Sequence, residues 1–542
     1  MREYLPIFIV LGIIGIFTLG FIAAYVREKH RKDGKGQDRN IPDGEIMRRL
    51  MVYAKPYWKE FLLVFFLMIL SNVYALVSPL LVGDIEEMVK NDFPLPRLYA
   101  MVGTYVAILL VSLGCTYIQS VILQKVGQKI LSALRLNVFT HIESLSHEQL
   151  NNIPTGKLVT RVANDTNAIS MMFTNILVTM LTNMMMVIGV LGAMLVLNYA
   201  LTLMVLCFVP FLVLFTIIFQ KFSRHVHRTV NNARTDVNTY LSENLSGMKV
   251  TQIFNQEQRK MDEFLVRSKR LEKTKMNRMF VFGIFRPMVY MLFVTSNLFL
   301  FYIGCKGYIK DTTFLGQTIT SETVVAFYMY ISRFFNPIQA LAEQFDMLEQ
   351  SFAAAEKIFT ILDMVPEVVD EPDAIELKEM KGEIEFRDVW FAYNPGEWVL
   401  KGVSFHVYPK QTVAFVGATG SGKSTILSLI CRNYDIQKGQ ILIDGIDIRH
   451  IKIASLRSHF GQMLQDVFLF AGDIRSNIVL RSDNVTDEDV WQACRYVNAD
   501  GFIRKLDGGL DEAVREQGNN FSAGQRQLLS FARTILHKPS VM

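Results

Sequence analysis

Charged side chains are scarce in this sequence: they make up 20% of its residues, whereas 51% are hydrophobic and the mean hydropathy is +0.25. A soluble domain carries roughly 25% charged residues. The deficit is concentrated in the first 350 positions, where uncharged blocks run longer than the core helices of a globular domain. This shortage of charge excludes an ordinary soluble protein and predicts an integral membrane protein.

Paired cysteines and metal-binding histidine spacings are also missing. None of the nine histidines forms an HxxxH or HExxH pattern, and the cysteines form no CxxC pair. These absences argue against a disulfide framework and against a transition-metal site. The cysteines are expected to be small buried hydrophobic residues. They are Cys115, Cys207, Cys305, Cys431 and Cys494.

Long uncharged stretches predict the membrane-spanning helices. Residues 166–220 contain no charge over 55 positions, which at ~1.5 Å per residue is more than twice a bilayer core of ~30 Å. This stretch is therefore predicted to form two helices with a turn near Asn198 and Tyr199. The seven candidate spans are residues 4–26, 61–83, 98–124, 166–220 (two spans), 287–305 and 323–342. Arg333 interrupts the last span; it either contacts a substrate, snorkels to the interface or pairs within its helix.

The charges between the spans predict their orientation. Residues 27–49 hold eight basic and five acidic side chains, and residues 221–278 hold thirteen and six, whereas residues 84–97 hold two and four. Basic connecting segments face the cytoplasm. This places Met1 outside a cell membrane and everything after about residue 343 inside. The first span is interpreted as a signal anchor rather than a cleaved signal peptide, because its positive charges follow the apolar stretch.

Two long polar segments, 125–165 and 221–278, separate spans on the cytoplasmic side. Apolar residues continue through them at helical spacing, and ~40 residues of helical hairpin reach ~30 Å beyond the bilayer. Each hairpin turns at a short polar tip, the first at Pro154 and Gly156 and the second at Gly247. Such tips are placed to contact a cytoplasmic domain; simple solvated loops are the alternative.

A linker and a second domain follow the last span. Residues 351–380 contain Pro366, Pro372 and an acidic run, which is typical of a linker. Further on, "TVAFVG" predicts a buried strand, "ATGSGK" a glycine-rich turn and "STILSLICRNY" a helix. GxxxxGK[ST] in this context is the P-loop. The P-loop residues predicted to bind ATP are Gly417, Thr419, Gly420, Ser421, Gly422, Lys423, Ser424 and Thr425.

Each part of this motif has a physical role. The glycines let the backbone curl so that successive N–H groups face the phosphates, and the following helix adds its positive end. Lys423 supplies charge to the β- and γ-phosphates, and the Ser424 hydroxyl is a ligand for Mg²⁺. Tyr393, 24 residues before the motif, can stack an adenine ring, although alone it is as readily a core aromatic. Gln465 can bridge Mg²⁺ and the attacking water.

Together these motifs make the sequence similar to the ATP-binding-cassette (ABC) exporters in their half-transporter form. The resemblance covers residues 41–542. It implies a membrane all-α transmembrane domain of six helices over 41–350 and an α/β P-loop ATPase domain over 381–542, joined by the linker 351–380. One extra N-terminal span with a basic cytoplasmic segment occupies residues 1–40.

The resemblance also assigns individual residues. It implies that Tyr393 is the adenine-stacking position and Gln465 the Q-loop glutamine. It identifies FSAGQ as the signature loop and Glu516 as the acidic position just before it. The hairpin tips near 150–157 and 243–255 match the family's coupling helices.

In this family two ATPase domains meet head to tail, and each ATP lies between one P-loop and the partner's signature. The usual signature has two glycines after the serine; here the first is alanine, which is expected to weaken that site. "FSAGQRQLL" resembles one subunit of bacterial heterodimeric multidrug exporters, so a heterodimer is favoured over a homodimer. The residues implied to contact ATP held by the second half-transporter are Ser522, Ala523, Gly524 and Gln525.

The family places an Asp and a catalytic Glu at the end of a strand that follows the signature helix. The sequence reads "ILHKPSVM" where that strand begins, so the general base is not among these residues. The sequence is therefore expected to be a fragment of a longer protein, and an inactive ATPase is the alternative.

The expected function is ATP-driven, Mg²⁺-dependent export of amphipathic small molecules of the multidrug or lipid type, by alternating access in a dimer embedded in membrane lipid. A peptide exporter and a non-hydrolysing regulatory or sensor subunit are the alternatives. A nucleic-acid ATPase is disfavoured, because the cytoplasmic flanks of the spans explain the net charge of +5.

Overall fold

The computed structural model describes residues 41–90, 95–309, 313–464, 466–480 and 484–542. The predicted first span and Gln465 lie outside these residues. The described chain divides into two compact units. One holds the residues up to Phe139 together with Val159–Ile361, and the other holds Thr140–Leu158 together with Leu362–Met542. The tip of the first hairpin thus belongs with the C-terminal domain.

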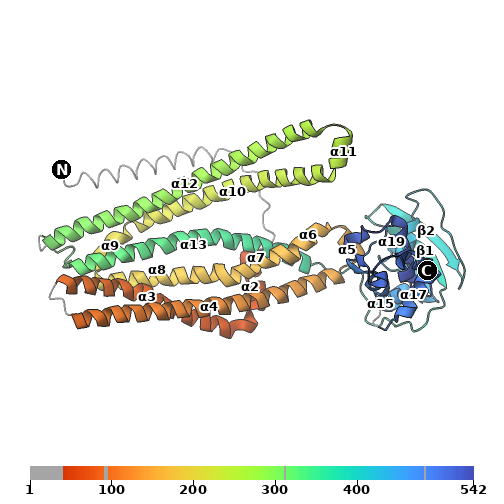
Figure 1. Ribbon diagram of the computed structural model, residues 1–542, viewed down its shortest axis with the longest axis horizontal. Helices are drawn as coiled ribbons and strands as arrows, with labels where there is room; N and C mark the ends of the chain where they lie inside the picture. Colours follow the sequence, from red (N-terminus) through yellow and green to blue (C-terminus); the bar gives the residue numbers. More distant parts are fainter. Residues whose placement is uncertain (1–40, 91–94, 310–312, 465, 481–483) are drawn as a thin grey trace. The chain divides into compact units, whose positions relative to one another are not determined.

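The first unit is built from helices (Figure 1). The longest extend far beyond a bilayer core: α4 has 50 residues and α12 has 53, or about 75 and 80 Å. Residues 140–144 of α4 and 155–158 of α6 belong to the second unit. The helices are α2 Asp43–Ala54, α3 Trp58–Lys90, α4 Leu95–Ser144, α6 Thr155–Thr160, α7 Thr166–Met171, α8 Leu177–Leu197, α9 Tyr199–Leu206, α10 Val209–Ser246, α11 Met248–Ile253, α12 Glu257–Ile309 and α13 Ser321–Leu362.

The turn predicted near Asn198 is confirmed. Asn198 has extended backbone angles between α8 and α9, and its Oδ1 accepts a hydrogen bond from Leu201 N (3.0 Å) that caps α9. The predicted span 323–342 lies in α13. This helix is not among the described helices that are apolar enough to cross a membrane, because polar residues such as Arg333 lower its hydropathy. Among the described residues, the helical stretches long and apolar enough to cross a membrane are Asp43–Val89, Leu95–Ser144, Thr155–Leu197, Tyr199–Phe219 and Glu257–Ile309.

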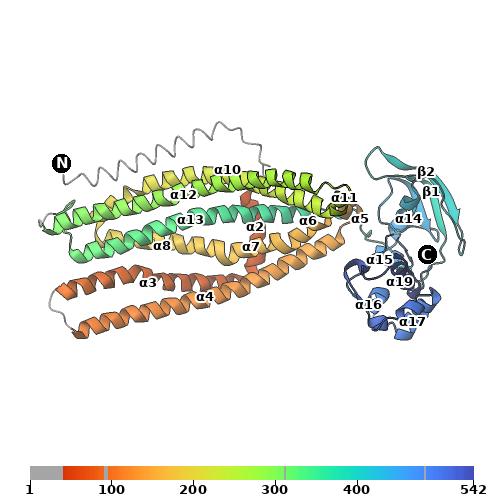
Figure 2. The ribbon, with the colours of Figure 1, turned by 45° about the horizontal axis from the view of Figure 1, so that its top comes forward.

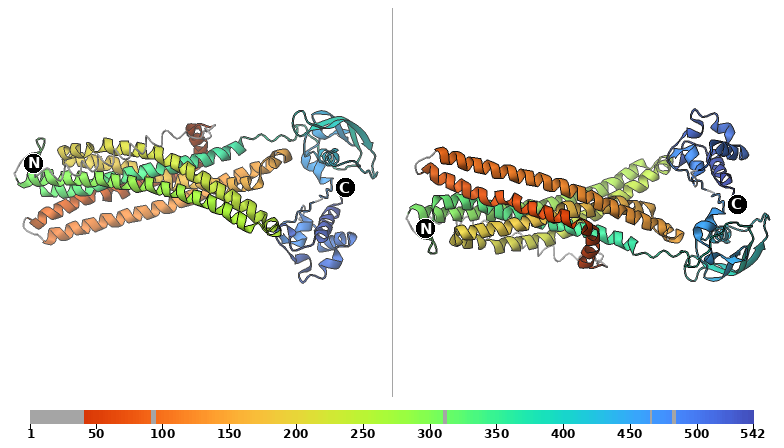
Figure 3. Two further views of the ribbon diagram at one scale, coloured as in Figure 1. Left: turned by 90° about the horizontal axis from the view of Figure 1, so that it is seen from above. Right: turned by 90° about the horizontal axis from the view of Figure 1, so that it is seen from below.

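One apolar core holds helices α8, α9, α10, α12 and α13 of the first unit together. In it Phe219 of α10 stacks on Phe285 of α12 with 3.9 Å between ring centroids, and Figure 2 shows α13 between α8 and the α10–α12 pair. α10 and α12 run side by side (Figure 3) and are joined through Gly247 and α11. The break predicted at Gly247 is confirmed.

The second unit carries a four-stranded antiparallel sheet in the order β2-β1-β3-β4. One core packs this sheet against α14, and a second core joins α16 to α19. The strands are β1 Ile384–Ala392, β2 Trp398–Val407, β3 Lys438–Ile443, β4 Ile446–Asp447, β5 Gly472–Asp473 and β6 Ala513–Val514. The helices are α5 His147–Asn151, α14 Lys423–Ile430, α15 Ile453–Ser458, α16 Ile474–Val479, α17 Asp487–Tyr496, α18 Asp500–Ile503 and α19 Ala523–Leu536.

The segment before the P-loop differs from the prediction. Residues 412–417, predicted as a buried strand, are irregular, and Val416 is 90% exposed. A strand persists only when its backbone groups pair with a neighbour, and no described residue pairs with this segment. Phe415 still packs edge-on against Phe405 of β2, with 5.4 Å between ring centroids. The helical structure of α13 also continues through Leu362, into the segment interpreted as linker.

Candidate nucleotide-binding site

The glycine-rich segment turns the chain sharply into α14. Gly420 and Gly422 have φ of 86° and 89°, a left-handed conformation that other residues rarely adopt. A Cβ atom on Gly422 would also lie 2.8 Å from the Leu400 side chain of β2. Glycine is therefore needed at position 422 both for the backbone angle and for the packing of the loop on the sheet.

Lys423 spans the loop that precedes it. Its Nζ donates hydrogen bonds to the carbonyl oxygens of Gly417 (2.9 Å) and Ala418 (2.8 Å). A positive charge, backbone N–H groups and hydroxyls thus gather at the start of an eight-residue helix, which is chemistry suited to binding phosphate. The exposed hydroxyl residues of the loop are Thr419, Ser421 and Ser424.

Tyr393 is connected to the P-loop helix. Its hydroxyl forms a hydrogen bond with the Thr425 hydroxyl (3.0 Å). Its ring lies edge-on to Phe391 and Tyr434, with centroid distances of 4.9 and 5.2 Å, yet the residue remains 40% exposed. Both interpretations of Tyr393 therefore apply in part: the ring is packed on one side, and an exposed aromatic surface remains next to the P-loop helix.

The tip of the first hairpin contacts the C-terminal domain through α5. Ser146 and Gln149 close a reciprocal capping box at its start. The Gln149 side-chain amide donates to the Val365 carbonyl (2.8 Å), and the Asn151 amide donates to the Tyr434 hydroxyl (3.4 Å). The prediction that this tip meets the C-terminal domain is confirmed, and for this first tip the solvated-loop interpretation is wrong.

Tyr434, which no sequence motif assigned to the site, lies between α5 and Tyr393. Its ring is edge-on to His147 as well as to Tyr393, with centroid distances of 5.9 and 5.2 Å. Burial raises the pKa of the Tyr434 hydroxyl. Burial and the nearby Glu367 carboxylate likewise raise the pKa of Glu148 on α5. These side chains border a cavity of about 490 Å³. Tyr434 is the last residue of the predicted P-loop helix, but its contact with α5 depends on the fold.

The predicted signature residues lie at the start of α19. Ser522 caps the helix: its Oγ accepts a hydrogen bond from Gln525 N (3.3 Å), and Gln525 Oε1 accepts one from Ser522 N (2.9 Å). Ser522, Ala523 and Gly524 are exposed, and a Cβ atom on Gly524 would meet nothing within 4 Å. Packing within the described chain therefore does not require glycine there. Glu516 lies in an exposed turn just before this loop.

Comparison with known proteins assigns the family. Residues 61–338 match the model of the ABC transporter transmembrane region, and residues 400–542 match the model described as ABC transporter. The chain belongs to the ABC transporters. It is 34% identical over 507 residues to the uncharacterized ABC transporter ATP-binding protein YknV of Bacillus subtilis strain 168, covering 92% of this chain and 82% of that protein.

Two further similarities concern this ABC transporter. It is 33% identical over 476 residues to the probable multidrug resistance ABC transporter ATP-binding/permease protein YheH of the same bacterium, covering 84% of this chain and 68% of that protein. It shares its fold with a bacterial Atm1-family ABC exporter solved with ATP bound, at a TM-score of 0.72 and 24% identity, over 92% of this chain and 85% of that one.

Family membership establishes the general activity of the ABC transporter. It is a multi-pass membrane protein with a cytoplasmic ATPase domain, which binds nucleotide and couples ATP hydrolysis to export. It has the half-transporter architecture, one transmembrane region and one ATPase domain, and such halves function as dimers. The expected fold, a helical transmembrane domain followed by a P-loop ATPase domain, is confirmed.

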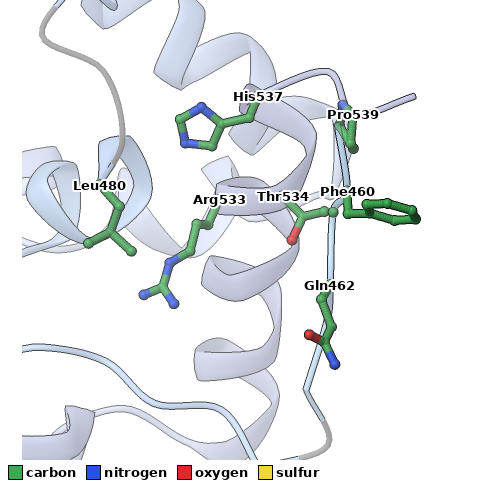
Figure 4. A pocket seen from close by; sticks show the side chains of 8 residues that line it. Phe460, Gln462, Leu480, Arg533, Thr534, His537 and Pro539 are labelled. Carbon is green, nitrogen blue, oxygen red and sulfur yellow. The ribbon is translucent and has the colours of Figure 1, made fainter. Parts of the chain in front are cut away.

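A second cavity of about 310 Å³ lies at the C-terminal end of α19 (Figure 4). Arg533 on its wall donates hydrogen bonds to the carbonyls of Asn477 (2.8 Å) and Phe468 (3.3 Å), so its charge is used within the fold. Burial lowers the pKa of this guanidinium. None of the described candidates for nucleotide binding lines this cavity.

Proposed function

We propose that this ABC transporter exports amphipathic small molecules, of the multidrug or lipid type, as one half of a dimer that alternates between inward-facing and outward-facing states. Tyr393 stacks the adenine of ATP, and the P-loop with Lys423 binds its phosphates. The exposed Ser424 hydroxyl, at the start of α14, fits a ligand of Mg²⁺, and Gln465 is proposed as the second. The name of the relative YheH, a probable multidrug resistance transporter, supports the substrate class.

The exposed start of α19 supports the proposed dimer most directly. Ser522 and Gly524 face open space, and no described residue accounts for the glycine. A glycine with no internal packing reason is expected where another molecule approaches the backbone closely. We propose that this molecule is the γ-phosphate of ATP on the partner's P-loop. Ala523, in place of the usual glycine, supports a heterodimer with two unequal sites.

Two variants test this arrangement in the full-length protein: Lys423→Ala, which disables the P-loop, and Ser522→Ala, which disables the signature. Each alone should lower ATP hydrolysis at least about tenfold. In a homodimer, mixing the two variants rebuilds one intact site and restores part of the activity. In a heterodimer, mixing them restores nothing, because two copies of this chain do not form the working pair. Unchanged hydrolysis in Ser522→Ala would contradict the role of the signature.

The substrate class is tested separately in inverted membrane vesicles. ATP-dependent uptake of an amphipathic dye or of a fluorescent phospholipid is the expected result, and it should disappear with Lys423→Ala. If a labelled peptide accumulates and the amphipathic probes do not, the peptide-exporter alternative is correct. If nothing accumulates although ATP is hydrolysed, export of this substrate class is refuted.

A further inference from the structure

Arg333 places a guanidinium inside the transmembrane domain. It lies on α13, within the predicted span 323–342, and is partly exposed. No carboxylate among the described residues forms an ion pair with it; the ionisable groups around it are tyrosines. A charge within a membrane costs several kcal/mol, so such residues face a protein interior or a polar cavity and usually have a function.

A proline in α3 explains how the guanidinium is held. Pro79 has no N–H, so the Ala75 carbonyl, four residues earlier, has no donor in its own helix. Arg333 donates one hydrogen bond to this carbonyl and another to the buried Ser78 hydroxyl (2.7 Å). These bonds reach α3, so pairing of Arg333 within its own helix is not what the structure shows. Helix α3 thereby fixes the orientation of a charge carried by α13.

The depth of the group argues against snorkelling to the membrane surface. Ala75 lies eight residues before Gly83, the end of the uncharged run 61–83, which is about 12 Å along the helix. Arg333 therefore binds α3 well inside the apolar stretch. A hydrogen bond from the Tyr330 hydroxyl to the Leu76 carbonyl (2.5 Å) joins the same two helices at this level.

Tyrosine rings complete the surroundings. The Arg333 guanidinium lies 5.8 Å from the centroid of the Tyr74 ring, a cation–π distance. The Tyr74 hydroxyl is 2.8 Å from that of Tyr105 on α4, and the two rings are edge-on. A guanidinium has five N–H donors, and the described residues accept from two of its nitrogens. The guanidinium therefore has hydrogen-bond donors left over beside the Tyr74–Tyr105 pair, among α3, α4 and α13.

We propose that Arg333, Tyr74 and Tyr105 form a subsite that binds the anionic head of an amphipathic substrate, a carboxylate or a phosphate. This inference rests on the proposed export of amphipathic molecules and adds the sign of the substrate's charge. A planar guanidinium already fixed by two hydrogen bonds can donate its remaining N–H groups to an oxyanion. The competing role, in which Arg333 only satisfies the Ala75 carbonyl, predicts no preference for charge.

The test compares three probes that share one apolar body: dansylamino-undecanoic acid, its carboxamide and the corresponding amine. Each is titrated by fluorescence against the full-length protein in phosphatidylcholine nanodiscs, with empty nanodiscs as background. The acid should bind at least about tenfold more tightly than the other two, the effect of one charge-assisted hydrogen bond. Fluorescent phosphatidic acid against phosphatidylcholine distinguishes a lipid phosphate from a small carboxylate.

Variants assign the preference to Arg333. Arg333→Gln should weaken binding of the acid about tenfold and leave the carboxamide within about twofold. Pro79→Ala restores an N–H partner for the Ala75 carbonyl, so Arg333 loses the hydrogen bond that fixes its orientation. The preference for the acid should then fall in a folded protein. The matched control is Lys306→Gln: Lys306 is an exposed cation 5.8 Å from the Tyr302 ring on α12, and its loss should change nothing.

The outcomes separate the two proposals. Equal binding of all three probes, or a preference that survives Arg333→Gln, overturns the anion subsite but leaves amphipath export standing. Binding of none of the probes overturns both. Should Arg333→Gln fail to fold, the preference in the wild-type protein and its reduction in Pro79→Ala still decide the matter.

Discussion

Replacing Tyr434 should uncouple the hairpin tip from the nucleotide site. The centroid of its ring lies 5.9 Å from that of His147 on α5, and its hydroxyl accepts a hydrogen bond from the Asn151 side-chain amide (3.4 Å). An edge-on aromatic pair contributes about 0.5–1.5 kcal/mol, and a neutral hydrogen bond of this length about 0.5 kcal/mol. Tyr434→Ala should therefore weaken docking of α5 by about 1–2 kcal/mol, or about five- to thirtyfold in the docking equilibrium.

Hydrogen exchange of the full-length protein measures this directly. Amides of α5 should lose about five- to thirtyfold of their protection in Tyr434→Ala, and stimulation of ATP hydrolysis by a transported amphipath should fall with it. Tyr434→Phe keeps the ring and should retain most of both effects. Asn151→Ala weakens the contact from the tip without touching Tyr393, which separates uncoupling from damage to the adenine side. Unchanged protection and stimulation in Tyr434→Ala would refute the reasoning.

Two further predictions concern the same domain. Gly422→Ala should lower both ATP affinity, by about tenfold, and the thermal midpoint, because a left-handed alanine costs about 1–2 kcal/mol and its Cβ meets Leu400 at 2.8 Å. Gly445→Ala has a similar φ of 82° but open space, so it should lower only the midpoint; a fluorescent ATP analogue and a thermal scan distinguish them. Burial and Glu367 raise the pKa of Glu148, so the docked carboxyl binds its proton more tightly and its contribution to stability is lost as pH rises through that pKa. Glu148→Gln should therefore raise the midpoint at neutral pH and match the wild type in acid; a gap independent of pH would disprove this.

Features with a local cause could be predicted from the sequence. The P-loop glycines, the turn at Asn198 and the break at Gly247 depend on the intrinsic backbone and capping preferences of single residues. The long uncharged runs depend only on the cost of charge in lipid. Composition and spacing can predict these features because they do not depend on contacts with distant parts of the chain.

Features that require two distant segments could not be predicted. Residues 412–417 have strand composition, but a strand also needs a neighbour, and none of the described residues provides one. Tyr434 acquires its role only because α5 docks beside it. The orientation of the Arg333 side chain depends on the Ala75 carbonyl of α3, which is free because Pro79 has no N–H. In each case the decisive partner is far away in sequence and leaves no periodic signal.

The docking of α5 has a consequence for biosynthesis. Gln149 and its partner Val365 are 216 positions apart in the chain. At about 5–20 residues per second, the ribosome delivers the second about 10–40 seconds after the first. During that interval the tip is finished while the domain that will receive it does not yet exist. The capping box of Ser146 and Gln149 involves only neighbouring residues, so it favours the start of this helix before the domain that α5 contacts has been made.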